Sequence, residues 1–167
     1  MENYLILKLN PTDYVFNEAR RKTNHFLESQ GFSDKTIQSQ VIILKELIRN
    51  ALDYGNFSPP NDTMTVYIHF DDTSITVELE NPIADTACKK LDELDKTIQL
   101  MRGYQDSFEA YMVKAREVSE NSLGSEKGGL GLVKIAYERN AIIDFFVSDD
   151  RILNMSATSS YQSGSRS

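Results

Sequence analysis

The stretch Glu46-Leu47-Ile48-Arg49-Asn50-Ala51-Leu52-Asp53-Tyr54-Gly55-Asn56 decides the fold prediction for this chain. Apolar residues recur upstream of it and through it at the three-and-four spacing of a buried helical stripe, at Ile37, Val41, Leu44, Ile48, Ala51 and Leu52. This spacing predicts one amphipathic helix over residues 33–54, which Gly55 ends. At 3.6 residues per turn, Glu46, Asn50 and Asp53 share the opposite face. A carboxylate and a carboxamide one turn apart suit a hard metal ion with a base beside it, and a solvated polar face is the alternative.

A second stretch, Gly124-Ser125-Glu126-Lys127-Gly128-Gly129-Leu130-Gly131-Leu132-Val133-Lys134-Ile135, is a glycine-rich loop that runs directly into an apolar helix. Backbone amides at a helix N-terminus attract phosphate, so the stretch predicts an anion site. A flexible loop or a tight helix–helix contact would also use glycines, and both remain open.

Taken in this order, Glu-x-x-x-Asn on a helix and then Gly-x-Gly-Leu at a helix start resemble the N-box and second glycine box of the GHKL (Bergerat-fold) ATPases. The N-box stretch looks most like that of the anti-sigma-factor serine kinases. The resemblance implies an α+β, two-layer sandwich, in which helices back a mixed, mostly antiparallel sheet. It also implies one domain over residues 1–158, with a helical lid insert at about 83–127 and a flexible tail at 159–167.

The resemblance also implies which residues would hold Mg²⁺ and ATP. Asn50 would bind the metal, and Glu46 would accept a proton as a general base. The remaining nucleotide contacts would come from Gly129, Leu130, Gly131 and Leu132 around the phosphates, and from Lys127 at the terminal phosphate. An exposed loop lysine is the alternative for Lys127.

The adenine-binding box of these ATPases departs from its usual form here. Its aspartate is missing, and Glu80-Asn81-Pro82 follows the second strand instead. Asn81 occupies the place of the aspartate, with Glu80 as the other candidate. An amide oxygen accepts a hydrogen bond less strongly than a carboxylate, so this box weakens the expectation of adenine selectivity.

Composition limits the compartment and the partners. The chain has 167 residues, 40% of them hydrophobic, which suits one ordinary globular domain. A net charge of −7 disfavours nucleic acid and anionic membranes and leaves a protein or a nucleotide as partner. A single cysteine, Cys88, excludes an intrachain disulfide. The N-terminus lacks the features of a signal peptide, so we expect a cytoplasmic protein.

The rest of the chain is expected to alternate strands and helices. His25 lies inside the first helix and is interpreted as a structural histidine. Strands are expected at 4–9, 63–70, 74–79, 141–147 and 151–157, and further helices at 14–30, 85–102, 104–120 and 130–139. The helices at 85–102 and 104–120 each have one strongly apolar face, which predicts extra core or a surface for a partner or a homodimer.

Three functions follow as hypotheses. The first is a Mg-ATP-dependent serine kinase of bacterial signalling, which the resemblance implies would phosphorylate an STAS-type antagonist and bind a sigma-factor-like regulator. The second is an ATP-dependent binding switch without phosphotransfer. The third is an interaction module that binds no nucleotide, which the altered Glu80-Asn81-Pro82 box favours.

Overall fold

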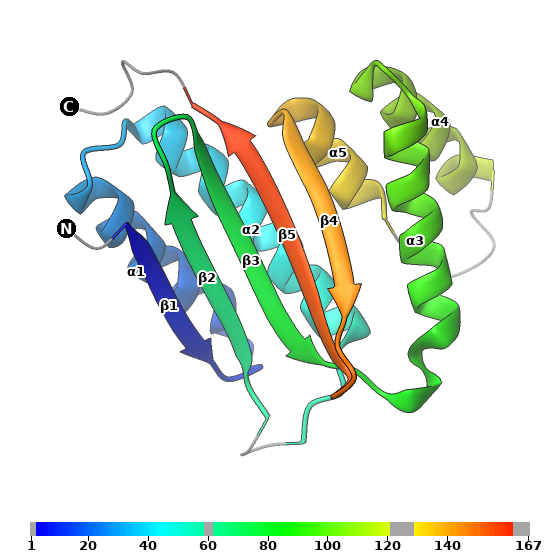
Figure 1. Cartoon of the computed structure of the whole chain (residues 1–167), viewed down its shortest axis with the longest axis horizontal. Coiled ribbons are helices and arrows are strands. Elements are labelled where there is room, and N and C mark those ends of the chain that lie inside the picture. Colours follow the sequence, from blue (N-terminus) through cyan, green and yellow to red (C-terminus); the bar gives the residue numbers. More distant parts are fainter. Residues whose placement is uncertain (1–2, 59–61, 121–128, 162–167) are drawn as a thin grey trace.

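The computed structural model describes residues 3–58, 62–120 and 129–161. Its α+β architecture is built on a five-stranded sheet in the order β1-β2-β3-β5-β4 (Figure 1). The strands are β1 (Tyr4–Leu9), β2 (Met64–Phe70), β3 (Ser74–Pro82), β4 (Ala141–Val147) and β5 (Ile152–Ser160).

Every neighbouring pair in this sheet is antiparallel, so the expectation of a mixed sheet was wrong for the described residues. The reason lies in the connections. Two successive helices separate β1 from β2 and return the chain to the end of the sheet where β1 stopped (Figure 1). The β2–β3 and β4–β5 hairpins are antiparallel because a short turn joins the two strands of each hairpin. They join where β3 pairs with β5.

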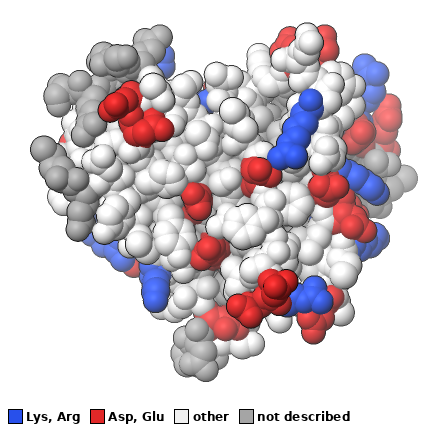
Figure 2. All heavy atoms as spheres, viewed as in Figure 1, with Lys and Arg blue, Asp and Glu red and all other residues white. Residues whose placement is uncertain are grey.

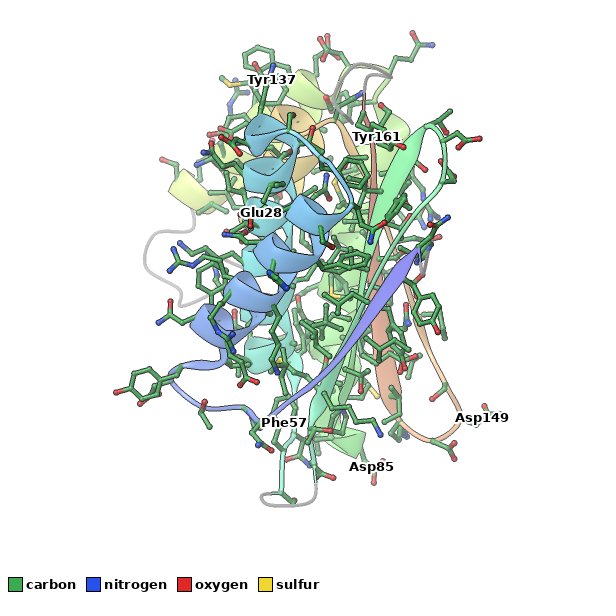
Figure 3. The ribbon with its side chains drawn as sticks, turned by 90° about the vertical axis from the view of Figure 1, so that its left-hand side faces the viewer. Glu28, Phe57, Asp85, Tyr137, Asp149 and Tyr161 are labelled. Carbon is green, nitrogen blue, oxygen red and sulfur yellow. The ribbon has the colours of Figure 1, made fainter. Side chains whose placement is uncertain are left out.

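The helices form the second layer and an extension at one edge. Helices α1 and α2 lie against one face of the sheet, and no helix of the described residues covers the other face (Figures 1 and 3). The charged groups on that open face can be followed in Figure 2. The helices are α1 (Val15–Ser29), α2 (Asp34–Tyr54), α3 (Cys88–Gly103), α4 (Ser107–Glu120) and α5 (Leu130–Glu138), with a 3-10 turn at Asp85–Ala87.

Helix α2 forms as the sequence predicts, but its buried face is rotated. Ser33 is the N-cap, and its Oγ accepts a hydrogen bond from Thr36 N at 3.3 Å. The core face passes through Leu44, Leu47 and Ala51, each fully buried. Leu52, which the predicted stripe included, is 43% exposed. It follows Ala51 by only about 100° of helical turn, which carries it out of the contact with the sheet.

The insert between β3 and β4 divides between core and surface. Helix α3 buries Leu94 and Ile98 completely or nearly so, whereas α4 leaves Phe108 43% and Met112 48% exposed. The Phe108 ring lies 5.1 Å from the Tyr137 ring of α5, measured between centroids. Part of the insert is therefore core, and self-association through α4 stays a prediction.

Two strands run further than expected. β3 continues through Glu80 and Asn81 to Pro82. β5 continues to Ser160, so the boundary placed at residue 159 was wrong: Ser159 is 3% exposed and accepts a hydrogen bond from Gln40 Nε2 of α2 at 2.9 Å. Pairing along the whole of β3 holds this end of β5 in the sheet. The rest of the predicted tail, residues 162–167, lies outside the described residues.

In the part of the chain that the structure describes, no helix has both the length and the apolar character that a membrane crossing needs.

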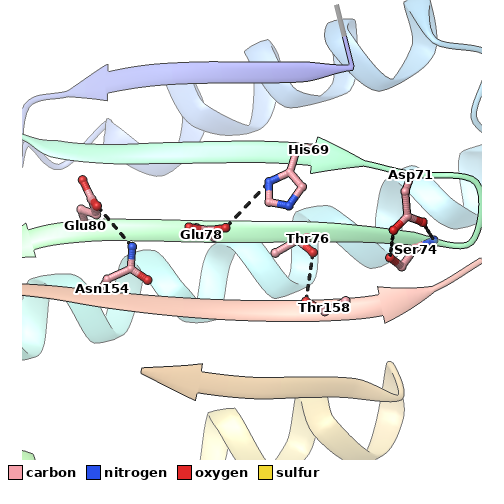
Figure 4. Close-up of polar contacts among 8 residues, drawn as sticks. All are labelled: His69, Asp71, Ser74, Thr76, Glu78, Glu80, Asn154 and Thr158. Carbon is pink, nitrogen blue, oxygen red and sulfur yellow. Dashed lines mark hydrogen bonds and ion pairs between the residues drawn. The ribbon is translucent and has the colours of Figure 1, made fainter. Parts of the chain in front are cut away.

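The β2–β3 hairpin is closed by one carboxylate. Asp71 Oδ1 accepts hydrogen bonds from Thr73 N and Ser74 N, both at 2.7 Å. Figure 4 shows Asp71 beside Ser74 at the hairpin turn. The hydroxyls of Thr73 and Ser74 add bonds of 3.0 and 3.1 Å. These donors favour the charged form and lower the pKa of Asp71 from 3.8 to about 2.

Protonation of Asp71 should therefore weaken the hairpin. Because the folded-state pKa lies below the unfolded one, the stabilisation is complete above the ordinary pKa of 3.8 and is lost as pH falls toward about 2. We expect Asp71→Asn to lower the thermal midpoint at pH 7, and the difference from wild type to shrink between pH 4 and pH 2. Circular dichroism melts across that range measure it. Asp72→Asn, an exposed neighbour with the same change in charge, is the control, and identical curves for the two variants would contradict the assignment.

Candidate functional site

Glu46 and Asn50 lie one turn apart on α2, as the sequence predicts, but they are not on a solvated face. Asn50 is 7% exposed, and its Nδ2 donates a hydrogen bond to the backbone oxygen of Glu46 at 2.6 Å. Its Oδ1 has no hydrogen bond within the described part of the chain. The side chain of Glu46 is 18% exposed. Both side chains are thus largely shielded from solvent.

The first turn of α5 covers the Glu46 carboxylate. A Cβ at Gly131 would collide with Glu46 Oε2, so the glycine lets the helix approach without displacing the flexible end of that side chain. Oε2 is buried and has no hydrogen-bond partner among the described residues, although Arg49 Nη1 lies 3.6 Å away. The N-terminal end of a helix carries partial positive charge, which favours an anion at this position.

Gly129 places α5 against α3. It is the N-cap of α5 in the left-handed conformation, with φ of 86°. A Cβ there would lie 2.6 Å from Thr97 Oγ1 of α3. Thr97 is 2% exposed, and its Oγ1 donates to Glu93 O at 3.0 Å. The glycine at 129 is therefore required by backbone conformation and by packing together.

Asn81 and Glu80 face opposite sides of the sheet. Asn81 is 1% exposed on the helix side, and its Oδ1 has no partner among the described residues. The end of β3 is tied to the end of α2, since Asn56 N donates to Pro82 O at 2.8 Å. Glu80 lies on the open face, where it accepts hydrogen bonds from Tyr67 Oη and Asn154 Nδ2.

The structure thus brings some of the predicted residues together and separates others. Glu46, Asn50, Gly129 and Gly131 meet where α2, α3 and α5 converge, and Asn81 lies at the end of the strand joined to α2. Leu130 begins α5, and Leu132 is fully buried as core. Glu80 is on the far side of the sheet, and Lys127 lies outside the described residues.

Sequence reasoning missed Thr97 and the ion pair of Arg49. Arg49 and Asp53 are both exposed, and Arg49 also pairs with Glu46. Thr97 shares the face of α3 that buries Leu94 and Ile98. That shared face was the available signal, because a polar residue on an apolar stripe often contacts a neighbouring helix.

No three His, Cys, Asp or Glu side chains are grouped to hold a metal ion within residues 3–58, 62–120 and 129–161. A magnesium ion at Asn50 would need most of its oxygen ligands from a bound phosphate or from water.

No protein-family model matches the sequence, and no curated protein matches it either. Among solved structures, the chain is similar to a chain in the crystal structure of the SiaB–SiaC complex from Pseudomonas aeruginosa. The match has a TM-score of 0.63 and 16% sequence identity, and covers 94% of this chain and 89% of the other. At this identity the similarity shows the fold alone.

The expected membership of the GHKL superfamily was wrong. The structural similarity found is to a component of the SiaB–SiaC complex, and no family model supports the assignment. The described part of the glycine box has a packing explanation: Gly131 lets α5 reach Glu46, and Gly129 supplies a left-handed cap beside Thr97. A helix–helix contact therefore accounts for the two described glycines of this box.

Replacing Gly129 should test this packing. Gly129→Ala forces a side chain into the left-handed region and onto Thr97, so we expect a loss of about 1–3 kcal/mol in the free energy of unfolding. Gly103→Ala, at the end of α3 with no atom near its added Cβ, is the control and should change little. Urea unfolding measures both. Equal stability of the two variants would show that Gly129 is not required by the contact.

Proposed function

We propose that the protein is a regulatory protein of signalling that acts in a complex with another protein and binds Mg-ATP between α2 and α5. Its fold similarity to a component of a two-protein complex supports the first part. The observation that carries the second part is that Asn50 Oδ1 and Glu46 Oε2, beside the N-terminus of a helix, have no hydrogen-bond partner among the described residues.

The polar atoms at this site fit a nucleotide by their chemistry. The first backbone amides of α5 have no partner inside their own helix and would donate to phosphate oxygens. Asn50 Oδ1 is an oxygen ligand of the kind that magnesium takes, and the bound metal would neutralise phosphate charge beside the Glu46 carboxylate. Asn81 Oδ1 is a buried acceptor without a partner among the described residues, and it suits an amino group such as that of adenine.

Burial makes the missing partners significant. A buried oxygen without a hydrogen bond costs about 1–3 kcal/mol, and Glu46 Oε2 and Asn81 Oδ1 are two such oxygens among the described residues. A ligand that supplied a metal ion and a donor would recover part of this cost. Because no protein cluster holds the metal among the described residues, magnesium and nucleotide would bind together.

Calorimetric titration tests the nucleotide proposal. Wild type should bind Mg-ATP, and Asn50→Ala should weaken binding about tenfold or more with magnesium and little without it, since the residue is assigned to the metal. Asp53→Ala, an exposed side chain one turn further along α2, is the control and should bind as wild type does. Absence of binding to wild type at millimolar nucleotide would refute the proposal.

Phosphoryl transfer to a serine of an STAS-type antagonist is a second candidate, favoured by the buried Glu46 carboxylate. Glu46 would accept the proton of the serine hydroxyl while the serine oxygen bonds to the γ-phosphorus of ATP. The bond from that phosphorus to the β-phosphate oxygen would break, and ADP would leave. Glu46→Gln keeps the shape and removes the base. It should bind Mg-ATP as well as wild type does, while transfer falls about a hundredfold or more.

The assay follows labelled γ-phosphate into STAS-type proteins from the same cell, with Asp53→Ala as the control. Equal transfer by wild type and Glu46→Gln would remove Glu46 from this role. Binding of ATP by wild type without transfer to any candidate would favour a switch that does not catalyse phosphotransfer.

A further inference from the structure

The open face of the sheet is an ordered array of side chains that no helix covers in the part of the chain that the structure describes (Figures 1 and 3). The strand registers arrange it in three rows that cross all strands from β1 to β4. The rows are Tyr4, His69, Thr76, Thr158, Ile142; then Ile6, Tyr67, Glu78, Ser156, Asp144; then Lys8, Thr65, Glu80, Asn154, Phe146. We call these residues the open face.

Large apolar side chains stand at both edges of the open face. Tyr4 and Ile6 on β1 are 52% and 51% exposed, and Ile142 and Phe146 on β4 are 75% and 59% exposed. Apolar groups gathered on one flat surface are typical of contact surfaces for other proteins. The edges alone do not identify the partner, because any apolar surface would suit them.

The centre of the open face is acidic and held in place. Glu80 accepts a hydrogen bond from Tyr67 Oη at 3.1 Å. It accepts another from Asn154 Nδ2 at 3.3 Å (Figure 4). Burial and this bond to Glu80 raise the pKa of Tyr67, which keeps its phenol a neutral donor. Two neutral donors orient the carboxylate without cancelling its charge.

The other carboxylates of the open face differ in how far a neighbouring cation balances their charge. Glu78 Oε1 lies 3.8 Å from Nδ1 of His69, which compensates it only when protonated. Asp144 is balanced by Arg102 of α3 at 2.8 Å. Lys8 stands at the outer end of the row that contains Glu80, two strands away. Acidic groups accordingly mark the middle of this face in Figure 2.

We propose that the open face docks a protein partner whose contact surface carries apolar side chains around lysine or arginine. The apolar edges would be covered by the partner, and its cations would meet Glu78 and Glu80 at the centre. This rests on the proposed function only in requiring a protein partner. The site between α2 and α5 is on the other side of the sheet, so the two surfaces can be tested separately.

A second copy of the chain does not fit this face. Twofold pairing of two open faces would bring the central carboxylates of both copies together, and like charges across an interface cost free energy. Nucleic acid and anionic lipid are disfavoured for the same reason, since the face and the whole chain, with net charge −7, are acidic.

Site-specific photocrosslinking in the native cell tests where the partner docks. A photoreactive phenylalanine analogue replaces Ile142 on the open face or Tyr14 at the start of α1, because both side chains are 75% exposed. We expect a crosslinked protein from position 142 and not from position 14, joined through a segment that contains lysine or arginine. Crosslinks from position 14 alone, no crosslink from position 142, or a crosslink there to a second copy of this chain would overturn the proposal.

Charge reversal then tests the chemistry with the purified partner found at position 142. Glu78→Lys should weaken binding about tenfold or more, and a Lys→Glu or Arg→Glu change in the crosslinked segment should restore it. Glu28→Lys, an exposed carboxylate on α1, is the matched control and should bind as wild type does. Equal binding by Glu78→Lys, with circular dichroism showing an intact fold, would overturn the proposal.

The same variants separate this inference from the nucleotide proposal. Glu78→Lys should keep the Mg-ATP affinity of wild type, because its side chain lies on the opposite side of the sheet from Asn50. Failure of wild type to bind nucleotide would refute the nucleotide proposal and leave the docking result standing.

Discussion

The contact between α2 and the first turn of α5 is the constraint on which the arrangement of the helices depends. Gly131 allows α5 to approach until its backbone meets the Glu46 carboxylate, and Gly129 turns the chain into α5 beside Thr97. This contact links α2, which covers the centre of the sheet, to α3 and α5 at the β4 edge. A side chain at Gly129 would meet Thr97 from a strained left-handed backbone, whereas one at Gly131 would displace the end of the Glu46 side chain.

The same contact makes the candidate site polar and closed at once. Helix packing usually buries apolar groups, yet here it buries a carboxylate oxygen and leaves a neighbouring asparagine oxygen without a partner in the described chain. The partial charge of the α5 N-terminus offsets some of the cost of the carboxylate. The packing explanation accounts for the glycines, whereas Asn50 and Asn81 have unmet hydrogen-bonding capacity that packing does not explain.

The sheet separates two surfaces because successive side chains of a strand point to opposite faces. Asn81 and Glu80 are adjacent in sequence, but one faces α2 and the other faces the open side. A ligand held by the helices and a protein docked on the open face would therefore contact different residues of the same strand. β3 is the central strand of the sheet, so a movement of this strand would displace residues on both surfaces.

The sequence by itself determined the elements and the amphipathic character of most of them. Periods of two and of 3.6 predicted all five strands and the main helices, and Glu46 and Asn50 were correctly placed on one helical face. The superfamily assignment failed because Glu-x-x-x-Asn and Gly-x-Gly report local spacing, and a close helix contact requires the same spacing as a phosphate site. Only the tertiary structure decided that Asn50 is buried, that Leu52 is exposed and that Glu80 lies on the other face of the sheet from the candidate site. Periodicity states which side chains share a face of one element, whereas burial depends on what that face meets. What each face meets is set by the sheet, in which β5 lies between β3 and β4. The β3–β5 pairs join residues about 80 apart in the chain, and no local pattern encodes such a pairing.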